Sequence, residues 1–317
     1  MMTPLHKEAV VLNEHHGQRV DVVLASLFPD YSRSQLTHWL KNGSITINAS
    51  QYKPKDKVRG GELVTLDVVL DACVDDNKPE DLSFAIVYED EHLLVVNKPA
   101  GLVVHPGAGN REHTLVNGLL FHCPSLQSLP RAGIVHRLDK DTTGLLLVAK
   151  TLKAHTNLIR QMQARDIERH YLALVHGHVI GGAILNTGFG RHPKNRLKMT
   201  VLTGGKNAIT HYALKKQFGG FTLLDVQLKT GRTHQIRVHM AHIHHPIVGD
   251  PLYGGRQRYP GGITDEVRAK LQQFKRQALH AATLSVHHPE TGNKMTFEAP
   301  IPTDLKLLLT TLESNLA

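Results

Sequence analysis

The run of apolar residues at positions 145–149, which follows the polar segment HRLDKDTTG, constrains the fold most strongly. Five consecutive apolar residues leave no polar face, so a strand made of them has to be covered on both sides. The segment just before the run places Arg137 and Asp139 two positions apart. We therefore expect a buried strand inside a sheet, with charged residues where the chain enters it.

The charged residues before this strand allow two interpretations. In an extended segment alternate side chains point the same way, so Arg137 and Asp139 share one side and His136 lies on the other. A carboxylate beside a guanidinium stays ionised, and an ionised aspartate in a partly dry cleft can act as a nucleophile. Taken alone, the segment favours the simpler interpretation, an ion pair that only fixes a loop.

The composition indicates a globular protein that meets polyanions. The chain has 317 residues, of which 41% are hydrophobic, and a formal net charge of +9 with a pI near 9.5. This excess of positive charge is typical of proteins that contact phosphate backbones, although a basic protein without a polyanionic partner remains the alternative.

Cysteine usage and the N-terminal sequence indicate a compartment. Cys73 and Cys123 are the only cysteines, too few and too far apart for a disulfide framework or a zinc knuckle. The chain begins without a signal-peptide pattern, and no apolar run approaches the roughly 20 residues that span a bilayer. We expect a reduced, cytoplasmic protein without a membrane partner.

An acidic segment that contains a proline, residues 71–82, is interpreted as a linker. It separates a small unit, residues 17–70, from a larger domain, residues 83–317. In the small unit, apolar spacing predicts one helix that ends at Pro29 and a second that Ser32 caps. SITIN and ELVTLDV alternate as strands do.

The small unit resembles the S4 RNA-binding domain. The residues that carry the resemblance are Arg19, Asp21, Leu24, Ser32, Arg33, Ile47, Asn48, Lys53, Pro54, Gly61 and Glu62. In that family two helices and the following strand present a basic face to structured RNA. The matching cations here are Arg19, Arg33, Lys41, Lys53 and Lys55. The alternative is a basic face that only contacts solvent.

The larger domain mixes strand and helix patterns without regular βαβ alternation, which predicts an α+β fold. Apolar runs flank the segment NKPAG on both sides as strands, and YLALVHGHV forms another strand. A hairpin turns at Gly219 and Gly220. Helices are expected over residues 151–164, over RTHQIRVHMAHI and over residues 304–316.

Four motifs in this domain, HRLDKDTTG, NKPAG, YLALV and KTGRTHQIRVH, resemble the RluA-type pseudouridine synthases. The resemblance extends from about residue 17 to about residue 253. It implies a mixed-sheet catalytic domain behind an S4-like domain. The family usually has serine where this chain has Thr143, and the hydroxyl is retained.

The resemblance assigns roles to four residues. Asp139 matches the catalytic aspartate, and Arg237 matches the basic residue that pairs with it. Tyr171 matches the tyrosine that packs against the target base and helps to remove a proton. Arg137 matches the arginine that holds the flipped-out arrangement of the RNA. Without the resemblance, Tyr171 would be a strand tyrosine and Arg237 a surface cation.

The implied reaction isomerises uridine in 23S rRNA, or in a precursor of the large ribosomal subunit, with no obligatory protein partner evident. It breaks the N1–C1′ bond and forms a C5–C1′ bond, so no cofactor or metal is expected. The target uridine leaves the stack at a cost of a few kcal/mol. Asp139 then either attacks C1′ or takes a proton from C2′, and the sequence leaves both routes open.

Two other functions compete with this one. A zinc site would need His239 and His242 with Asp250 as the nearest acid, but the HExxH pattern is absent, and we favour solvated or RNA-facing histidines. A metal-dependent hydrolase is therefore the weaker alternative. The stronger is a catalytically inactive S4-type RNA-binding or ribosome assembly protein, against which the intact run from His136 to Asp139 argues.

Overall fold

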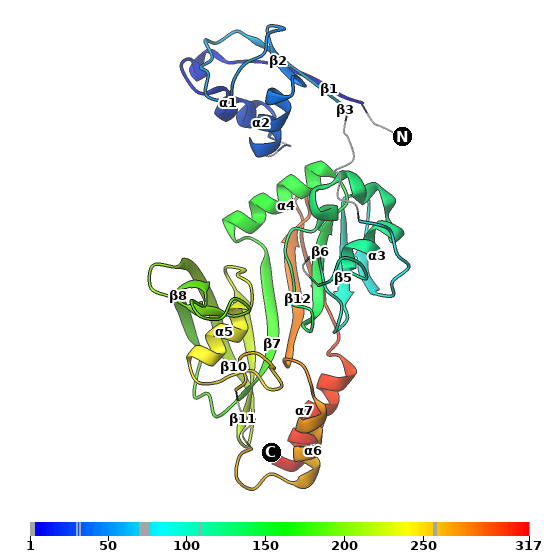
Figure 1. The fold of residues 1–317 in the computed structure, drawn as a ribbon, viewed down its shortest axis with the longest axis vertical. Helices are drawn as coiled ribbons and strands as arrows, with labels where there is room; N and C mark the ends of the chain where they lie inside the picture. The colour runs from blue at the N-terminus through cyan, green and yellow to red at the C-terminus, as the bar shows by residue number, and fades with distance from the viewer. Residues whose placement is uncertain are drawn as a thin grey trace.

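The computed structural model describes residues 4–29, 31, 33–69, 77–107, 109–255 and 259–316. Within them the chain builds a small N-terminal unit and a larger domain around a long sheet (Figure 1). The proposed helix cap Ser32, residues 71–76 of the proposed linker and Cys73 within it lie outside the described residues.

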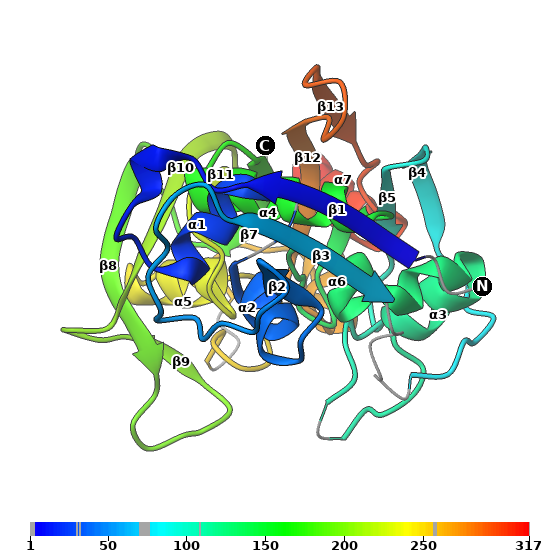
Figure 2. The same cartoon turned by 90° about the horizontal axis from the view of Figure 1, so that it is seen from above.

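The N-terminal unit packs two helices on a three-stranded sheet, as its sequence predicts in part. Its elements are β1 (Pro4–Val10), η1 (Asn13–His15), α1 (Val20–Leu27), α2 (Arg33–Lys41), β2 (Ile45–Ile47) and β3 (Leu63–Val69). The predicted inward residues Leu36, Trp39 and Leu40 are buried in one cluster. Strand β1 was not expected, yet it pairs antiparallel with β3, and the two lie side by side in Figure 2. Its apolar residues Leu5, Ala9 and Val10 do not alternate regularly with polar ones, so the sequence does not indicate a strand there.

The larger domain is an α+β fold with a mixed sheet, as predicted. Ten strands join in the order β4-β5-β6-β12-β7-β11-β10-β8-β9, with β13 paired to β12. The pairing of β6 with β12 is parallel, and the other pairings are antiparallel. The strands are β4 (Ala85–Glu89), β5 (Leu93–Lys98), β6 (Thr143–Ala149), β7 (Glu168–His176), β8 (Ala183–Arg191), β9 (Met199–Val201), β10 (Lys206–Phe218), β11 (Phe221–Leu228), β12 (Leu279–His287) and β13 (Lys294–Glu298).

Helices cover this sheet and its ends (Figure 1). They are α3 (Leu115–His122), η2 (Pro124–Ser128), η3 (Pro130–Gly133), α4 (Leu152–Ala164), α5 (Gln235–His242), α6 (Asp265–Gln273) and α7 (Thr303–Leu316). Helices α4, α5 and α7 lie where the apolar spacing predicts them. The sequence patterns did not predict α3, α6, β4, β8, β9, β12 or β13.

Strand β6 is buried along its whole length, which confirms the first prediction. Leu146 and Val148 join a cluster that includes residues of α3, while Leu145 and Leu147 join a second cluster with residues of α4. The two clusters occupy opposite faces of the strand, because side chains alternate along it. This explains why the run carries no polar residue.

One predicted strand is wrong. The apolar run after NKPAG does not continue as a strand, and Val103 makes only an isolated bridge with Thr114. The reason is the side chain of Lys98, which is fully buried and donates to the carbonyl oxygens of Pro99 and Leu102 at 2.8 and 3.0 Å. With these carbonyls bound to the ammonium group and Gly101 at φ +82°, the chain turns instead of pairing.

Candidate active site

Asp139 lies in the irregular segment between η3 and β6, at the edge of a small cavity. Its predicted partners Arg137, Tyr171 and Arg237 line the same cavity, which has a volume of about 40 Å³. The complete lining is Arg137, Leu138, Asp139, Thr142, Tyr171, Leu228, Arg232, His234, Gln235, Ile236, Arg237 and Leu279.

Arg237 of α5 connects two carboxylates. Its Nη1 donates to Oδ2 of Asp139 at 3.0 Å, and its Nε and Nη2 donate to the two oxygens of Asp250 at 2.7 and 2.9 Å. Asp250 also accepts the backbone N–H groups of Leu252 and Tyr253. Burial alone would lower the pKa of Arg237, but the two carboxylates outweigh it and raise that pKa. The guanidinium therefore stays charged and is fixed in orientation.

The partner of Asp139 is thus Arg237, and not the nearby Arg137 that the segment alone suggested. Because residues 134–139 do not form a strand, strict alternation does not hold along them. Arg137 and Asp139 nevertheless both face the cavity, and the exposed Arg137 side chain lies at its mouth.

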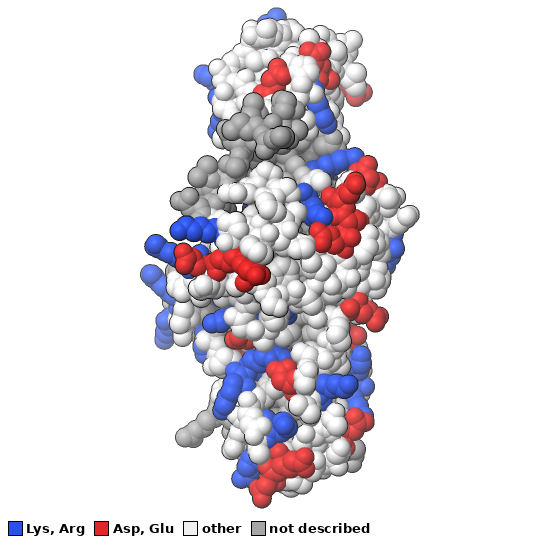
Figure 3. Space-filling model, turned by 90° about the vertical axis from the view of Figure 1, so that its right-hand side faces the viewer, with Lys and Arg blue, Asp and Glu red and all other residues white. Residues whose placement is uncertain are grey.

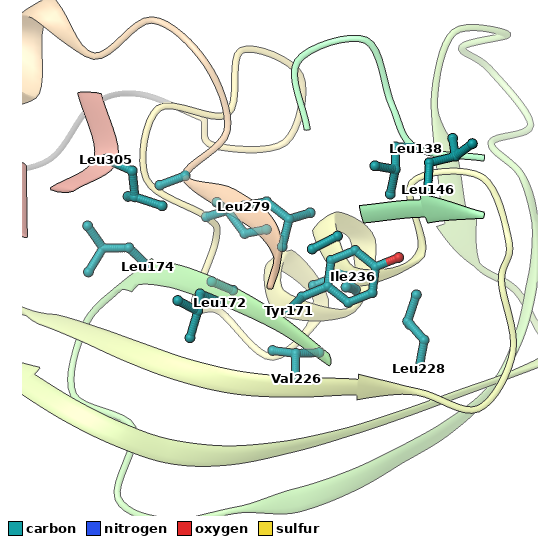
Figure 4. Packing of buried hydrophobic residues seen from close by; sticks show 14 of the residues in the cluster. Leu138, Leu146, Tyr171, Leu172, Leu174, Val226, Leu228, Ile236, Leu279 and Leu305 are labelled. Carbon is teal, nitrogen blue, oxygen red and sulfur yellow. The ribbon is translucent and has the colours of Figure 1, made fainter. Parts of the chain in front are cut away.

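Tyr171 projects from β7 and is 4% exposed. Figure 4 shows its ring beside Ile236, with the hydroxyl directed away from Leu172 and Leu174. Burial raises the pKa of this phenol, and the nearby charge of Arg169 only partly offsets the effect. Arg169 is itself buried two residues earlier on β7, and its Nε is without a hydrogen-bond partner. Arg169 was not predicted as a site residue, although it lies two positions before Tyr171, the first residue of YLALV.

The segment that carries Asp139 is tied to the sheet at several points. Lys98 Nζ donates to the carbonyl oxygen of Lys140 at 2.8 Å, and burial lowers the pKa of this lysine. The Nε2 atom of His136 accepts the backbone N–H of Leu147 at 3.0 Å. Burial lowers the pKa of His136 to about 3, so the ring is neutral and able to accept. Thr143, which replaces the serine of the family, bonds through Oγ1 to Nδ1 of the buried His280.

The turn before α5 places His234 in the cavity, a residue that the sequence predicted only as one of a group of histidines. His234 has φ +58°, and its Nε2 lies 3.9 Å from Oδ1 of Asp139. Gln235 shapes this turn by accepting from the Arg232 backbone N–H and from the Thr230 hydroxyl. The motif KTGRTHQIRVH contains all four residues, so it was the signal available in the sequence.

The proposed zinc ligands do not come together. His239 is fully buried and its two nitrogens bond to the hydroxyls of Thr187 and Thr210, which corrects the expectation of a solvated or RNA-facing ring. Burial lowers its pKa to about 4. His242 is exposed, and Asp250 is bound to Arg237. Among the described residues no group of three or more potential metal ligands occurs.

The N-terminal unit carries a second candidate site. Four of the five predicted RNA-binding residues line one groove of about 780 Å³: Arg19, Lys41, Lys53 and Lys55. The fifth, Arg33, lies beside Arg19, because both guanidinium groups bind Asp21 at 2.7 and 3.0 Å. Burial alone would raise the pKa of Asp21, but these two arginines lower it. We call these five cations with Asp21 the basic groove.

One face of the molecule shows charged side chains of both signs (Figure 3). On the face drawn in Figure 3, basic and acidic side chains lie intermixed, so the visible residues form no continuous basic surface there. In the part of the chain that the structure describes, no helix combines the length and apolar character needed to cross a membrane.

Comparison with known proteins gives consistent matches. Residues 92–242 match the family described as RNA pseudouridylate synthase, and residues 18–64 match the S4 domain. "Ribosomal large subunit pseudouridine synthase D" of Xanthomonas campestris is 51% identical over 98% of this chain and 94% of its own length. The protein of that name from Pseudomonas aeruginosa is 48% identical over 99% and 98%.

Solved structures show the same fold at lower identity. Human RNA Pseudouridylate Synthase Domain Containing 4 aligns with a TM-score of 0.58 and 23% identity, over 72% of this chain and 93% of that one. Human RNA Pseudouridylate Synthase Domain Containing 1 aligns with a TM-score of 0.53 and 24% identity, over 75% and 97%. The high identity to the bacterial relatives over nearly the full length, with the family match over residues 92–242, shows that the chain belongs to the RluA-type RNA pseudouridylate synthase family.

Proposed function

We propose that the protein isomerises specific uridines to pseudouridine in 23S rRNA of the large ribosomal subunit, with Asp139 as the catalytic carboxylate. The observation that carries the proposal is the convergence of Asp139, Tyr171 and Arg237 on one cavity, although 98 positions separate Asp139 from Arg237. The names of the bacterial relatives support the choice of a large-subunit RNA. In this proposal residues 17–70 bind RNA, 71–82 link the domains and 83–317 catalyse.

The two oxygens of Asp139 have different tasks in this mechanism. Oδ2 is held by Arg237, which leaves Oδ1 facing the cavity for the ribose. Oδ1 either attacks C1′ or removes the proton from C2′, and both routes break the N1–C1′ bond of a flipped uridine. Arg237 stabilises the carboxylate whenever it is negatively charged. C5 then bonds to C1′ as the carboxylate leaves C1′, or as the proton returns to C2′ in the second route. The C5 proton is released and N1 takes up a proton, so the isomerisation gains and loses no atom overall.

In this mechanism Tyr171 contacts the uracil base and Arg137 contacts the RNA strand. The flat ring of Tyr171 stacks on the released uracil and permits it to rotate. Because burial raises its pKa, the phenol is protonated when the base arrives, so it acts at C5 only after losing that proton. Arg137, exposed at the mouth, is in position to hold the RNA from which the uridine has left.

The test combines a map of pseudouridines in 23S rRNA with an assay of the variant Asp139→Asn. Pseudouridines in 23S rRNA are mapped in cells with and without the protein, and a site that disappears identifies the target. Asp139→Asn should then abolish tritium release from C5-labelled RNA that contains this site. Asp225→Asn, which changes a half-exposed carboxylate on β11, serves as the control for folding and should retain activity.

An inactive RNA-binding protein is the second candidate, supported by the basic groove. It predicts that the wild-type protein binds the RNA and releases no tritium. Release by Asp139→Asn at the wild-type rate would exclude Asp139 from the mechanism.

A further inference from the structure

We infer that His234 and Asp139 form a donor–acceptor pair that binds the 2′-hydroxyl of the flipped nucleotide, which makes His234 a specificity-determining residue for ribose over deoxyribose. The inference rests on the proposed function, because it requires a uridine in the cavity of Asp139. It concerns an atom of the substrate that neither bond change involves.

The position of His234 is the first observation. Its side chain is 20% exposed and lines the cavity, and its Nε2 lies 3.9 Å from Oδ1 of Asp139. This distance is longer than a hydrogen bond, so the two atoms face each other without being bonded. Arg237 binds Oδ2, so Oδ1 is the oxygen that remains to accept a hydrogen bond from a ligand.

The hydrogen bonds behind His234 favour one tautomer. The Oη atom of Tyr253 accepts the backbone N–H of Met199 at 2.8 Å and lies 2.9 Å from Nδ1 of His234. Burial raises the pKa of Tyr253, so the phenol keeps its proton. Because Oη already accepts the Met199 N–H, we assign the hydroxyl as the donor to Nδ1. Burial also lowers the pKa of His234, despite the attraction of Asp139. The neutral ring therefore carries its proton on Nε2, on the side of the cavity.

A hydroxyl group matches this pair of atoms. An oxygen at ordinary hydrogen-bond distance from both can accept from Nε2–H and donate to Oδ1, since each contact spans about 2.8 Å and the gap is 3.9 Å. The 2′-oxygen is the ribose hydroxyl attached next to C1′, where Asp139 acts. In deoxyribose this oxygen is missing, and both protein atoms lose their partner. The 2′-hydroxyl is also the group by which proteins distinguish RNA from DNA.

The experiment is a cycle between enzyme and substrate. The substrate is an rRNA fragment with the mapped target uridine, prepared with either ribose or 2′-deoxyribose at that one position. Wild-type enzyme and His234→Asn are compared by kcat/KM on both. Asparagine tolerates the left-handed backbone of residue 234, so the turn is retained. We expect kcat/KM of the wild type to be at least about a hundredfold lower on the deoxyribose substrate than on the ribose substrate. For His234→Asn this ratio should be smaller by at least about tenfold.

Two further variants sharpen the result. Tyr253→Phe removes the phenol that sets the tautomer and should reduce the discrimination in the same direction by a smaller factor. His242→Gln changes an exposed histidine at the end of α5 and should discriminate between the ribose and deoxyribose substrates as the wild type does. Equal discrimination by the wild type and His234→Asn would overturn the inference alone. If the wild type did not convert the ribose substrate, the proposed function would fail, and this inference with it.

Discussion

At the scale of single residues, Arg237 organises the candidate active site because it is buried between two carboxylates. Asp250 is fully buried, holds two of its nitrogens and is itself held by two backbone N–H groups. A charge removed from water in this way is stable only while its partners remain. Asp250 is therefore a positioning residue, which acts on Asp139 through Arg237.

Asp250→Asn should lower the free energy of unfolding by about 3 kcal/mol, because it leaves a buried guanidinium with half of its compensation. The same change should reduce kcat while the folded fraction stays high in the assay. Unfolding in urea and tritium release measure the two effects. Glu290→Gln is the control, because it breaks an ion pair with Lys153 in which the two side chains are 43% and 54% exposed. Its free energy of unfolding should fall by about 1 kcal/mol or less. An equal fall in the two variants would mean that the burial of Arg237 does not determine the effect of Asp250→Asn.

The sequence could identify some of these residues and not others. Asp139, Tyr171 and Arg237 were predicted because each lies inside a motif that resembles the family. Asp250 was considered only as a metal ligand, since nothing near it indicates that its partner is Arg237. His239 was expected in contact with solvent or RNA, because a sequence does not state which face of a short helix the protein covers.

At the scale of elements, the parallel pairing of β6 with β12 determines where Asp139 lies. Gly144 pairs with Ala281 and has φ +110°. A Cβ atom there would lie 2.1 Å from the carbonyl oxygen of Ala281, closer than any real contact. The glycine of HRLDKDTTG thus permits the strand to approach its neighbour directly after the segment that carries Asp139.

Gly144→Ala should destabilise the protein by at least about 3 kcal/mol and displace the start of β6. Chemical denaturation checks the first effect, and hydrogen exchange of the β6 amides checks the second. Gly292→Ala is the matched control, because Gly292 has φ +73° and open space around its missing side chain. Only the cost of the left-handed backbone, about 1–2 kcal/mol, should appear there. A similar loss in both variants would show that crowding at β12 is unimportant.

At the scale of the whole molecule, buried histidines make stability depend on pH. Burial lowers the pKa of His136 to about 3 and that of His239 to about 4, whereas an unfolded histidine titrates near 6.5. Between these values the unfolded chain binds more protons than the folded one. The stabilisation is therefore complete above about pH 6.5 and is lost as the pH falls towards 4.

We expect the free energy of unfolding to fall by up to about 1.4 kcal/mol per pH unit and per histidine between pH 6 and pH 4.5. Urea titrations across this range measure the slope. His239→Gln should reduce this slope by the contribution of one histidine, up to about 1.4 kcal/mol per pH unit. His242→Gln, at an exposed position, should leave the slope unchanged. A slope that both variants share with the wild type would assign the acid sensitivity to other groups.

The basic groove predicts how the molecule holds RNA. Lys53→Ala combined with Lys55→Ala should weaken binding of the target rRNA fragment and reduce the slope of log K against log salt by about 1 per lost phosphate contact. Filter binding at several salt concentrations provides the measurement. Lys306→Ala, on the exposed side of α7, changes charge away from the groove and should leave the slope as it is. If it altered the slope equally, the effect would come from net charge alone.

The sequence by itself determined the buried strand β6, the mixed α+β fold, several helices and the family, because apolar periodicity and motifs are local properties of the chain. It could not show that β1 completes the small sheet, that Lys98 turns the chain after NKPAG, or that Asp250 and His234 complete the site. The pairing of β1 with β3 and the bond from Arg237 to Asp139 join residues far apart in the sequence, and only the tertiary fold brings them together. The bonds from Lys98 to Pro99 and Leu102 are local, but the burial of this lysine is a property of the folded domain. The tertiary structure therefore decided which atoms surround Asp139, since hydrogen-bond distances depend on packing that no short motif encodes.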